Sequence, residues 1–171
     1  MRHPATWLVA ADTTTGEKVA FGSPGSPPAT LAEAIAASWA IPGWFPPVRI
    51  GDREYVDGGT VSTASADLVI PLDLDEVVVL APMASADPAP ANGASRVERL
   101  LRRRMTKGLD CEISQLRAAG TRVVRLEPTQ QDLDTMGANF MDLRRRDSVL
   151  ETAVRTSPAR VRDALEEGAR A

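Results

Sequence analysis

The chain has 171 residues, of which 43% are hydrophobic and 25% are charged. This composition is typical of a soluble globular protein, and the length suits one domain with a substantial core. No apolar run is long enough to span a bilayer, and the N-terminus lacks the apolar core of a signal peptide, so we expect a cytoplasmic protein. The net charge of −3 argues against general affinity for nucleic acid.

Charge is distributed unevenly along the chain. Residues 1–90 hold 4 basic and 11 acidic side chains, whereas residues 91–171 hold 16 and 12. Arginine triplets at 102–104 and 144–146 lie in the second part. Acidic residues are interleaved around both triplets, which favours solvated helix faces over a nucleic-acid-binding patch.

The histidine and cysteine counts limit the chemistry. His3 is the only histidine and Cys111 the only cysteine, so the chain cannot form an internal disulfide, a cysteine-based zinc site or a multi-histidine metal site. The acidic residues also lack the spacing of a calcium loop. A Ser-His-Asp or Cys-His arrangement would depend on a residue at the N-terminus. We expect no metal and no cofactor, and we expect Cys111 to pack in or beside the core on a helix.

The first part of the chain predicts a hairpin followed by a helix. Residues 6–11 and 17–21 are β-prone runs around a turn-rich link, which is the pattern of a hairpin. Thr30 is followed three residues later by Glu33, and this spacing predicts a capping box at the start of a helix. That helix is rich in alanine and has to end before Pro42.

Two short strands, residues 48–50 and 54–56, then deliver Asp57 onto Gly58 and Gly59. Glycine lets the chain turn sharply, and it lets another backbone or a substrate come close. This arrangement would present a carboxylate at the mouth of a site. The same three residues also fit an ordinary Asp-Gly turn of a hairpin, so the local pattern leaves both interpretations open.

The second part predicts a parallel crossover. Residues 76–80 form a continuous β-branched run, which is typical of a strand buried on both faces. Ser95 and Glu98 predict a second capping box, at the start of a helix whose apolar stripe closes at Gly120. Residues 121–126 form the next strand. Strand, helix and strand in this order indicate a right-handed parallel crossover and an α/β fold with mostly parallel strands flanked by helices.

Helices are predicted for the C-terminal part. One is expected around 143–156, and another begins with Ser157 as its cap and Pro158 at its first position. We find no internal repeat and no domain boundary. Residues 1–171 are therefore expected to form a single domain, with its C-terminal helical part at 95–171.

A family resemblance is carried by the run ASWAIPGWFPPV, residues 37–48, followed by YVDGG, residues 55–59. Together they resemble the C-terminal part of the patatin-like phospholipase family. The densest match is residues 31–80, and most of the chain is covered. The neighbouring runs that are also similar to the family are AADTTTGEKVAFG, DLDEVVVLAP and EPTQQDLDTMGANFMDLRRRDSVLETA. The fold implied is a partial, incomplete patatin-like domain.

The resemblance implies a serine acyl hydrolase, a phospholipase or lipid esterase that acts in lipid degradation. Family members use a Ser-Asp dyad without histidine, and Asp57 stands at the position of the general base, supported by Gly58 and Gly59. A carboxylate has to be desolvated and placed within hydrogen-bond reach of a hydroxyl to act as its base. The implied substrate is a lipid or acyl ester, with peripheral membrane contact.

The nucleophile of the family is missing from this sequence. No serine stands in the G-x-S-x-G elbow that exposes the nucleophile. Ser23 has Phe21 in place of the first glycine, and Ser95 has Gly93 but Val97 in place of the second. The glycine-rich oxyanion loop is absent as well. The chain is therefore expected to carry the Asp-bearing part of the site and to be inactive alone.

Four residues are candidates to line an acyl pocket, namely Trp39, Pro42, Trp44 and Phe45. The family usually has a small or sulfur-containing residue where Trp39 stands, and core packing is the favoured role for this indole, ahead of reshaping the pocket. Trp44 and Phe45 either line the loop beside Asp57 or pack under the proline-rich loop.

A function of another class is also open. The chain could be a non-catalytic remnant or an interaction module. Apolar faces and strand edges that the rest of a patatin-like domain would cover favour self-association or binding of a partner chain.

Overall fold

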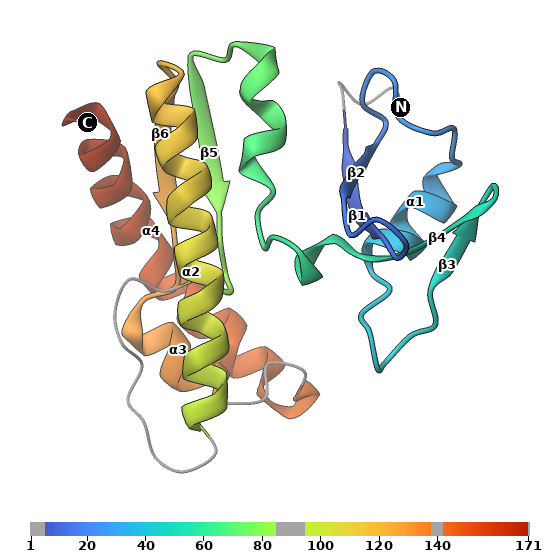
Figure 1. The fold of residues 1–171 in the computed structure, drawn as a ribbon. Coiled ribbons are helices and arrows are strands. Elements are labelled where there is room, and N and C mark those ends of the chain that lie inside the picture. The colour runs from blue at the N-terminus through green and yellow to red at the C-terminus, as the bar shows by residue number, and fades with distance from the viewer. Residues whose placement is uncertain (1–5, 85–94, 138–141, 171) are drawn as a thin grey trace. The chain divides into compact units, whose positions relative to one another are not determined.

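The computed structural model describes residues 6–84, 95–137 and 142–170, with the side chains of 95–103 and 169–170 left out of that description. The chain divides into two compact units, Met1–Leu68 (unit 1) and Val69–Ala171 (unit 2). Figure 1 shows the elements of each. His3 lies outside the described residues, as do the side chains of the predicted Ser95–Glu98 capping box.

Unit 1 is a four-stranded antiparallel sheet with one helix, in the strand order β2-β1-β4-β3. Its elements are β1 (Leu8–Asp12), β2 (Lys18–Phe21), α1 (Leu31–Ser38), β3 (Val48–Ile50) and β4 (Arg53–Asp57). Both predicted hairpins are confirmed. The strands of this sheet are antiparallel where mostly parallel strands were expected, because two-strand hairpins need only short turns and pair neighbours in opposite directions.

The helix of unit 1 begins as predicted. The Thr30 side chain accepts from the backbone of Glu33, and the Glu33 carboxylate accepts from the backbone of Thr30, which completes the capping box. The two hydrogen bonds give acceptors to backbone amides that have no partner within the helix. The hydrogen bond from the Thr30 backbone, and after it a bond donated by the Thr30 hydroxyl to the same carboxylate, lower the pKa of Glu33.

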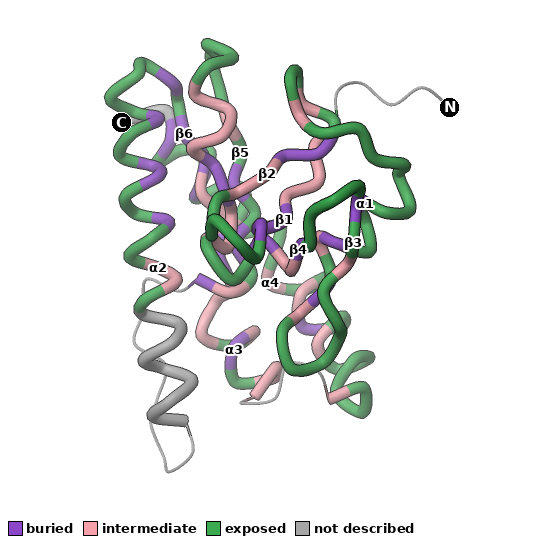
Figure 2. Tube along the Cα trace, turned by 45° about the vertical axis from the view of Figure 1, so that its right-hand side comes forward, coloured by how far each residue is buried: buried purple, intermediate pink, exposed green. Residues whose placement is uncertain are grey.

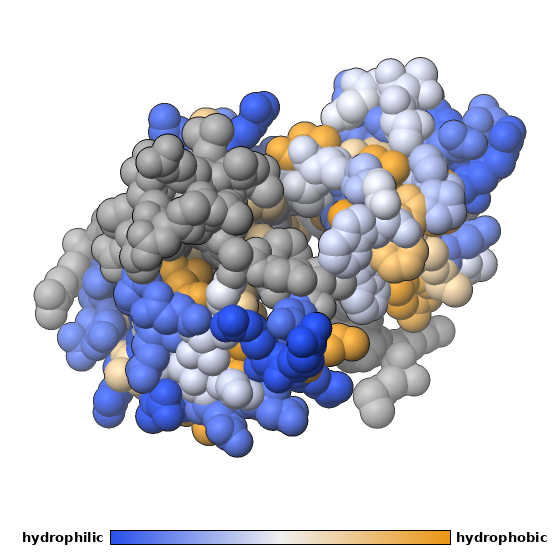
Figure 3. Space-filling view, turned by 90° about the horizontal axis from the view of Figure 1, so that it is seen from below, coloured by the Kyte–Doolittle hydropathy of each residue, from blue (hydrophilic) through white to orange (hydrophobic). Residues whose placement is uncertain are grey.

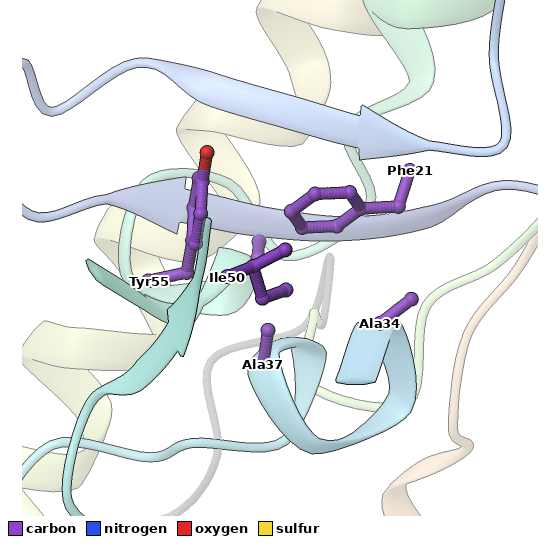
Figure 4. Packing of buried hydrophobic residues seen from close by; sticks show 6 residues of the cluster. Phe21, Ala34, Ala37, Ile50 and Tyr55 are labelled. Atoms are coloured by element: carbon purple, nitrogen blue, oxygen red, sulfur yellow. The ribbon is translucent and has the colours of Figure 1, made fainter. Parts of the chain in front are cut away.

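The core of unit 1 combines two aromatic rings with small residues (Figure 4). Phe21 and Tyr55 meet edge to face, with ring centroids 5.0 Å apart and an interplanar angle of 78°. Ala34 and Ala37 of α1 are buried against them. Alanine side chains let the helix backbone come close to the sheet, so the core is thin and depends on close approach.

A buried carboxylate links the two hairpins of unit 1. The side chain of Asp12 is 1% exposed and accepts from Arg53 Nη1 at 2.7 Å. It also accepts from the backbone amides of Thr14 at 2.8 Å and Thr15 at 3.1 Å. The Arg53 hydrogen bond and these amides hold the pKa of Asp12 below its ordinary value. No sequence pattern predicted this pair, because Asp12 and Arg53 lie in two separate turn segments.

Unit 2 places helices around a parallel strand pair. Its elements are β5 (Glu76–Leu80), α2 (Ser95–Ala118), β6 (Arg122–Leu126), α3 (Gln130–Met136) and α4 (Arg146–Arg170), with the 3-10 turn η3 (Leu143–Arg145) before α4. A further 3-10 turn, η2 (Ala66–Leu72), includes the last residues of unit 1 and the first of unit 2. β5 and β6 are parallel, with Val78 opposite Val124. The predicted parallel crossover and the α/β class are confirmed.

The apolar stripe predicted on α2 forms the core of unit 2. Leu109, Ile113 and Leu116 are buried, together with Val123 and Val124 of β6. Figure 2 shows the buried segments of the chain in purple. The expected packing of the single cysteine is wrong. Residue 111 is on a helix but exposed, because a position two residues from a buried one lies on the opposite side of a helix.

Burial of β5 on both faces is also wrong. Val79 is buried, but Val78 is 51% and Leu80 is 71% exposed. Side chains of a strand alternate between faces, so these two share the exposed face. A run of β-branched residues indicates a strand without showing which of its faces is covered.

The C-terminal helices differ from the prediction. α4 is one continuous helix with Pro158 inside it, where a new helix capped by Ser157 was expected. Proline removes one backbone donor, but α4 packs along β6, where Ala164 and Gly168 are buried. α3 was not predicted, although the Thr129–Asp132 capping box was its signal.

Candidate functional site

The two halves of the resemblance motif are joined by a backbone hydrogen bond. The Asp57 amide, at the end of β4, donates to the carbonyl of Ala40, just beyond the end of α1, at 3.0 Å. Ala40 is 1% exposed. The segment that leaves α1 is thus fixed to the residue before the double glycine. No sequence pattern had pointed to Ala40 in this role.

Asp57 is held by its own turn. Its Oδ1 accepts from the Gly59 amide at 2.7 Å, and its carbonyl accepts from Thr60 Oγ1 at 2.7 Å. Asp57 thereby caps the 3-10 turn η1 (Gly58–Thr60). The residue is half-buried. Among the described residues, Oδ2 has no hydrogen-bond or ion-pair partner, so one carboxylate oxygen is oriented by the turn while the other can accept a proton.

Close approach explains the need for glycine at position 58. A Cβ atom there would lie 2.7 Å from the Val9 carbonyl oxygen, which belongs to β1. At Gly59 a Cβ would lie 3.0 Å from Asp57 Oδ1. Neither glycine has a positive φ. The structure therefore shows the expected close approach of another backbone, and the chain turns through η1 without a left-handed glycine.

The predicted pocket-lining residues lie at the surface. Trp39 is 64% exposed, so its expected core packing is wrong, and Trp44 and Phe45 are 57% and 52% exposed. Pro42 is exposed too. Packing of the two aromatic residues under the proline-rich loop is therefore wrong as well. Trp39 directly precedes Ala40, so it is tied through one residue to the Asp57 turn.

Trp39 continues an apolar face of α1. Leu31 and Ile35 precede Trp39 at intervals of four residues and are 68% and 44% exposed. Residues four apart lie on the same face of a helix, and the opposite face carries the buried alanines. Figure 3 shows hydrophobic residues open to solvent between hydrophilic ones. Such side chains can receive an apolar ligand or a protein surface.

Hydroxyl groups near the turn do not reach the carboxylate. Among the described residues, no serine or threonine side chain bonds to the Asp57 carboxylate; Ser62 Oγ instead accepts from the Ser65 amide at 2.9 Å. Thr63 Oγ1 is buried without a partner in the described structure. Among all residues that the structure describes, no three His, Cys, Asp or Glu side chains cluster as metal ligands. No helix of the described residues is long and apolar enough to cross a membrane.

A comparison with protein-family models matches residues 4–70 to the family described as Patatin-like phospholipase. This range includes all four strands of unit 1, α1 and the Asp57-Gly58-Gly59 turn. The similarity is to a family of lipid acyl hydrolases. Residues 4–70 are thus similar in sequence to this family, and the resemblance inferred from the sequence is confirmed over this range.

Proposed function

We propose that the chain carries the base-bearing part of a patatin-like serine acyl hydrolase, a phospholipase or lipid esterase, with Asp57 as the general base. The observation that supports this most is the hydrogen bonding of the two oxygens of the Asp57 carboxylate. Oδ1 is fixed by the Gly59 amide at 2.7 Å, whereas Oδ2 has no partner among the described residues. Gly58 and Gly59 support this geometry.

In the proposed mechanism a serine hydroxyl attacks the ester carbonyl while its proton passes to Oδ2 of Asp57. The alcohol leaves with a proton, and an acyl-serine remains. Water then attacks this ester, again losing a proton to the carboxylate, and Asp57 returns that proton to the serine oxygen as the fatty acid is released. The exposed side chains of Trp39, Trp44 and Phe45 would contact the acyl chain and keep water away from the base.

The nucleophile has to come from a polypeptide outside these 171 residues, because none of their serines stands in a G-x-S-x-G elbow. The chain alone should therefore hydrolyse p-nitrophenyl acyl esters at the background rate. Robust turnover by the purified chain, abolished by a serine-trapping fluorophosphonate, would contradict this part of the proposal.

The role of Asp57 is tested by joining the chain to the G-x-S-x-G-bearing segment of a patatin-like phospholipase. In an active fusion, Asp57→Asn should lower kcat by roughly 10²–10⁴-fold, the usual contribution of a general base. Asp52→Asn is the matched control, since Asp52 is an exposed acid in the β3–β4 turn. Equal activity of the two variants would exclude Asp57 as the base.

A second candidate function is an interaction module that binds a partner chain along β5. The exposed Val78 and Leu80 support it, as does the pairing of β5 with β6 alone among the described strands. An open strand edge with apolar neighbours is a template for another strand. Leu80→Lys should then abolish binding of the partner while leaving an active fusion unaffected. Unchanged binding by this variant would exclude β5 as the surface.

A further inference from the structure

We propose that α4 is a self-association surface, on which two copies of the chain pair through antiparallel α4 helices. Four apolar side chains of this helix are open to solvent. Leu150, Val154, Val161 and Leu165 are 62%, 67%, 38% and 44% exposed. At about 100° of rotation per residue they share a sector roughly 60° wide. Thr152, Thr156 and Arg160, which are buried or half-buried, lie on another face, whereas the buried Ala164 and Gly168 border the stripe in the last turns of α4.

The order of the stripe makes it complementary to itself. The residue types read Leu, Val, Val, Leu, separated by four, seven and four positions, and the reversed helix has the same order and spacing. An antiparallel second copy therefore places Leu150 opposite Leu165 of the partner subunit, and Val154 opposite Val161 of the partner subunit. The two-fold axis passes between Ser157 and Pro158. Such a closed, isologous contact is the commonest form of oligomer.

Charges beside the stripe fit the same pairing. Glu151 and Arg162 are exposed and lie on the same flank of the stripe. In the antiparallel pair, Glu151 comes within about 3 Å, measured along the helix axis, of Arg162 of the partner subunit. Symmetry makes this contact twice. Arg155, also on this flank, is directed back toward Thr152 Oγ1 at 3.5 Å.

Other binding partners fit the exposed stripe of α4 less well than a second copy of the chain. α4 contains five basic and five acidic residues, so it lacks the cationic face of a helix that binds anionic lipid. The stripe from 150 to 165 extends roughly 22 Å along the helix. A contact of this length is smaller than a standard stable interface, so we expect a reversible dimer with a Kd in the micromolar range.

The first test is sedimentation equilibrium over a concentration series. The wild-type chain should dimerise, and Leu150→Glu combined with Leu165→Glu should keep it monomeric up to at least tenfold higher concentration. The control is Leu31→Glu, because Leu31 is similarly exposed at 68% but lies in unit 1. Circular dichroism checks that the variants keep their helix. A wild-type monomer at all concentrations, or equal dissociation by the control, would overturn the proposal.

The second test fixes the pairing. Glu151→Arg should weaken the dimer about tenfold, and adding Arg162→Glu should restore it. In a Cys111→Ser background, Val154→Cys and Val161→Cys chains should form a disulfide only when the two are mixed. Each alone places its cysteines about 10 Å apart along the axis, beyond disulfide reach. Crosslinking of either variant alone, or no rescue by the charge exchange, would overturn the antiparallel arrangement.

Discussion

The internal packing of unit 1 differs from that of unit 2. In unit 1, backbones approach closely across alanine and glycine, with the Phe21–Tyr55 contact and the Asp12–Arg53 pair as its main side-chain links. In unit 2, a stripe of Leu109, Ile113 and Leu116 packs long helices on a parallel strand pair. Added atoms should therefore cost most at the close backbone contacts of unit 1, such as that of Gly58, and removed atoms should cost most in the leucine-rich core of unit 2. Substitutions in both units test this contrast.

The largest effect is expected from Leu116→Ala in unit 2. Leu116 is fully buried, and removing its methyl groups loses transfer free energy and leaves a cavity, at a cost of about 2–5 kcal/mol. Hydrogen exchange across a denaturant series should show the loss in residues 69–171. Leu143→Ala, at a site that is 82% exposed, should cost little. An equal effect of the two variants would contradict the assigned core.

Gly58→Ala should destabilise unit 1 by about 1–3 kcal/mol, the usual cost of overpacking. The added Cβ would lie 2.7 Å from the Val9 carbonyl oxygen, so β1 and β4 have to separate. At Gly59 the nearest atom is the movable Asp57 carboxylate, at 3.0 Å, and Gly59→Ala should cost less. Chemical denaturation followed by hydrogen exchange in unit 1 compares them. Wild-type stability of Gly58→Ala would show that the approach to Val9 is not required.

A glycine-to-alanine substitution in unit 2 should instead increase stability. Gly108 lies on α2 with no atom within 4 Å of its virtual Cβ. Alanine at this position should raise the free energy of unfolding by about 0.5–1 kcal/mol, because it restricts the unfolded chain and favours helix. Denaturation midpoints measure the change. A loss of stability at this site would erase the proposed difference between the units.

The smallest effect concerns the acid response of unit 1. The Arg53 hydrogen bond and the amides of Thr14 and Thr15 lower the pKa of Asp12 in the folded state. Its stabilising contribution is thus complete above the ordinary pKa of 3.8 and is lost as pH falls through the lower, folded value. Asp12→Asn should reduce the acid dependence of unit 1 unfolding at pH values below the ordinary pKa of 3.8. If the pH dependence of unit 1 unfolding is the same in Asp12→Asn and the wild type, Asp12 does not contribute to the acid response.

In unit 2 the matched carboxylate is Asp132. Burial favours its neutral form, but hydrogen bonds from Thr129 and Thr156 outweigh burial and lower its pKa. Asp132→Asn should therefore change the acid response of unit 2 and leave that of unit 1 unaltered. The two variants together serve as mutual controls for the pH experiment.

Local signals predicted the elements of unit 1 well. The capping box at Thr30, both hairpins and the position of Asp57 at a strand end depend on neighbours in sequence, and all are confirmed. Contacts between distant positions were not predictable in this way. The Asp12–Arg53 pair joins residues 41 positions apart, and the bond from Asp57 to Ala40 also needs the folded sheet.

The wrong predictions in unit 2 concern burial and helix bounds, which depend on tertiary packing. The periodicity of α2 identified the buried stripe, but a β-branched run could not show that Val78 and Leu80 would be exposed. Ser157-Pro158 is a good local start of a helix, yet the packing of α4 outweighs this preference. At the candidate site, the motif predicted a turn with Asp57 at a strand end, whereas the exposure of Trp39 depends on which face of α1 meets the sheet.

The exposed indoles have an optical consequence. All three tryptophans, Trp7, Trp39 and Trp44, belong to unit 1, and unit 2 has none. Tryptophan emission is therefore a reporter of unit 1 alone. Trp39 and Trp44 are already hydrated in the folded chain, so the red shift on unfolding should come mainly from the half-buried Trp7. By contrast, emission from the two exposed indoles should respond when an acyl chain or a protein surface covers them.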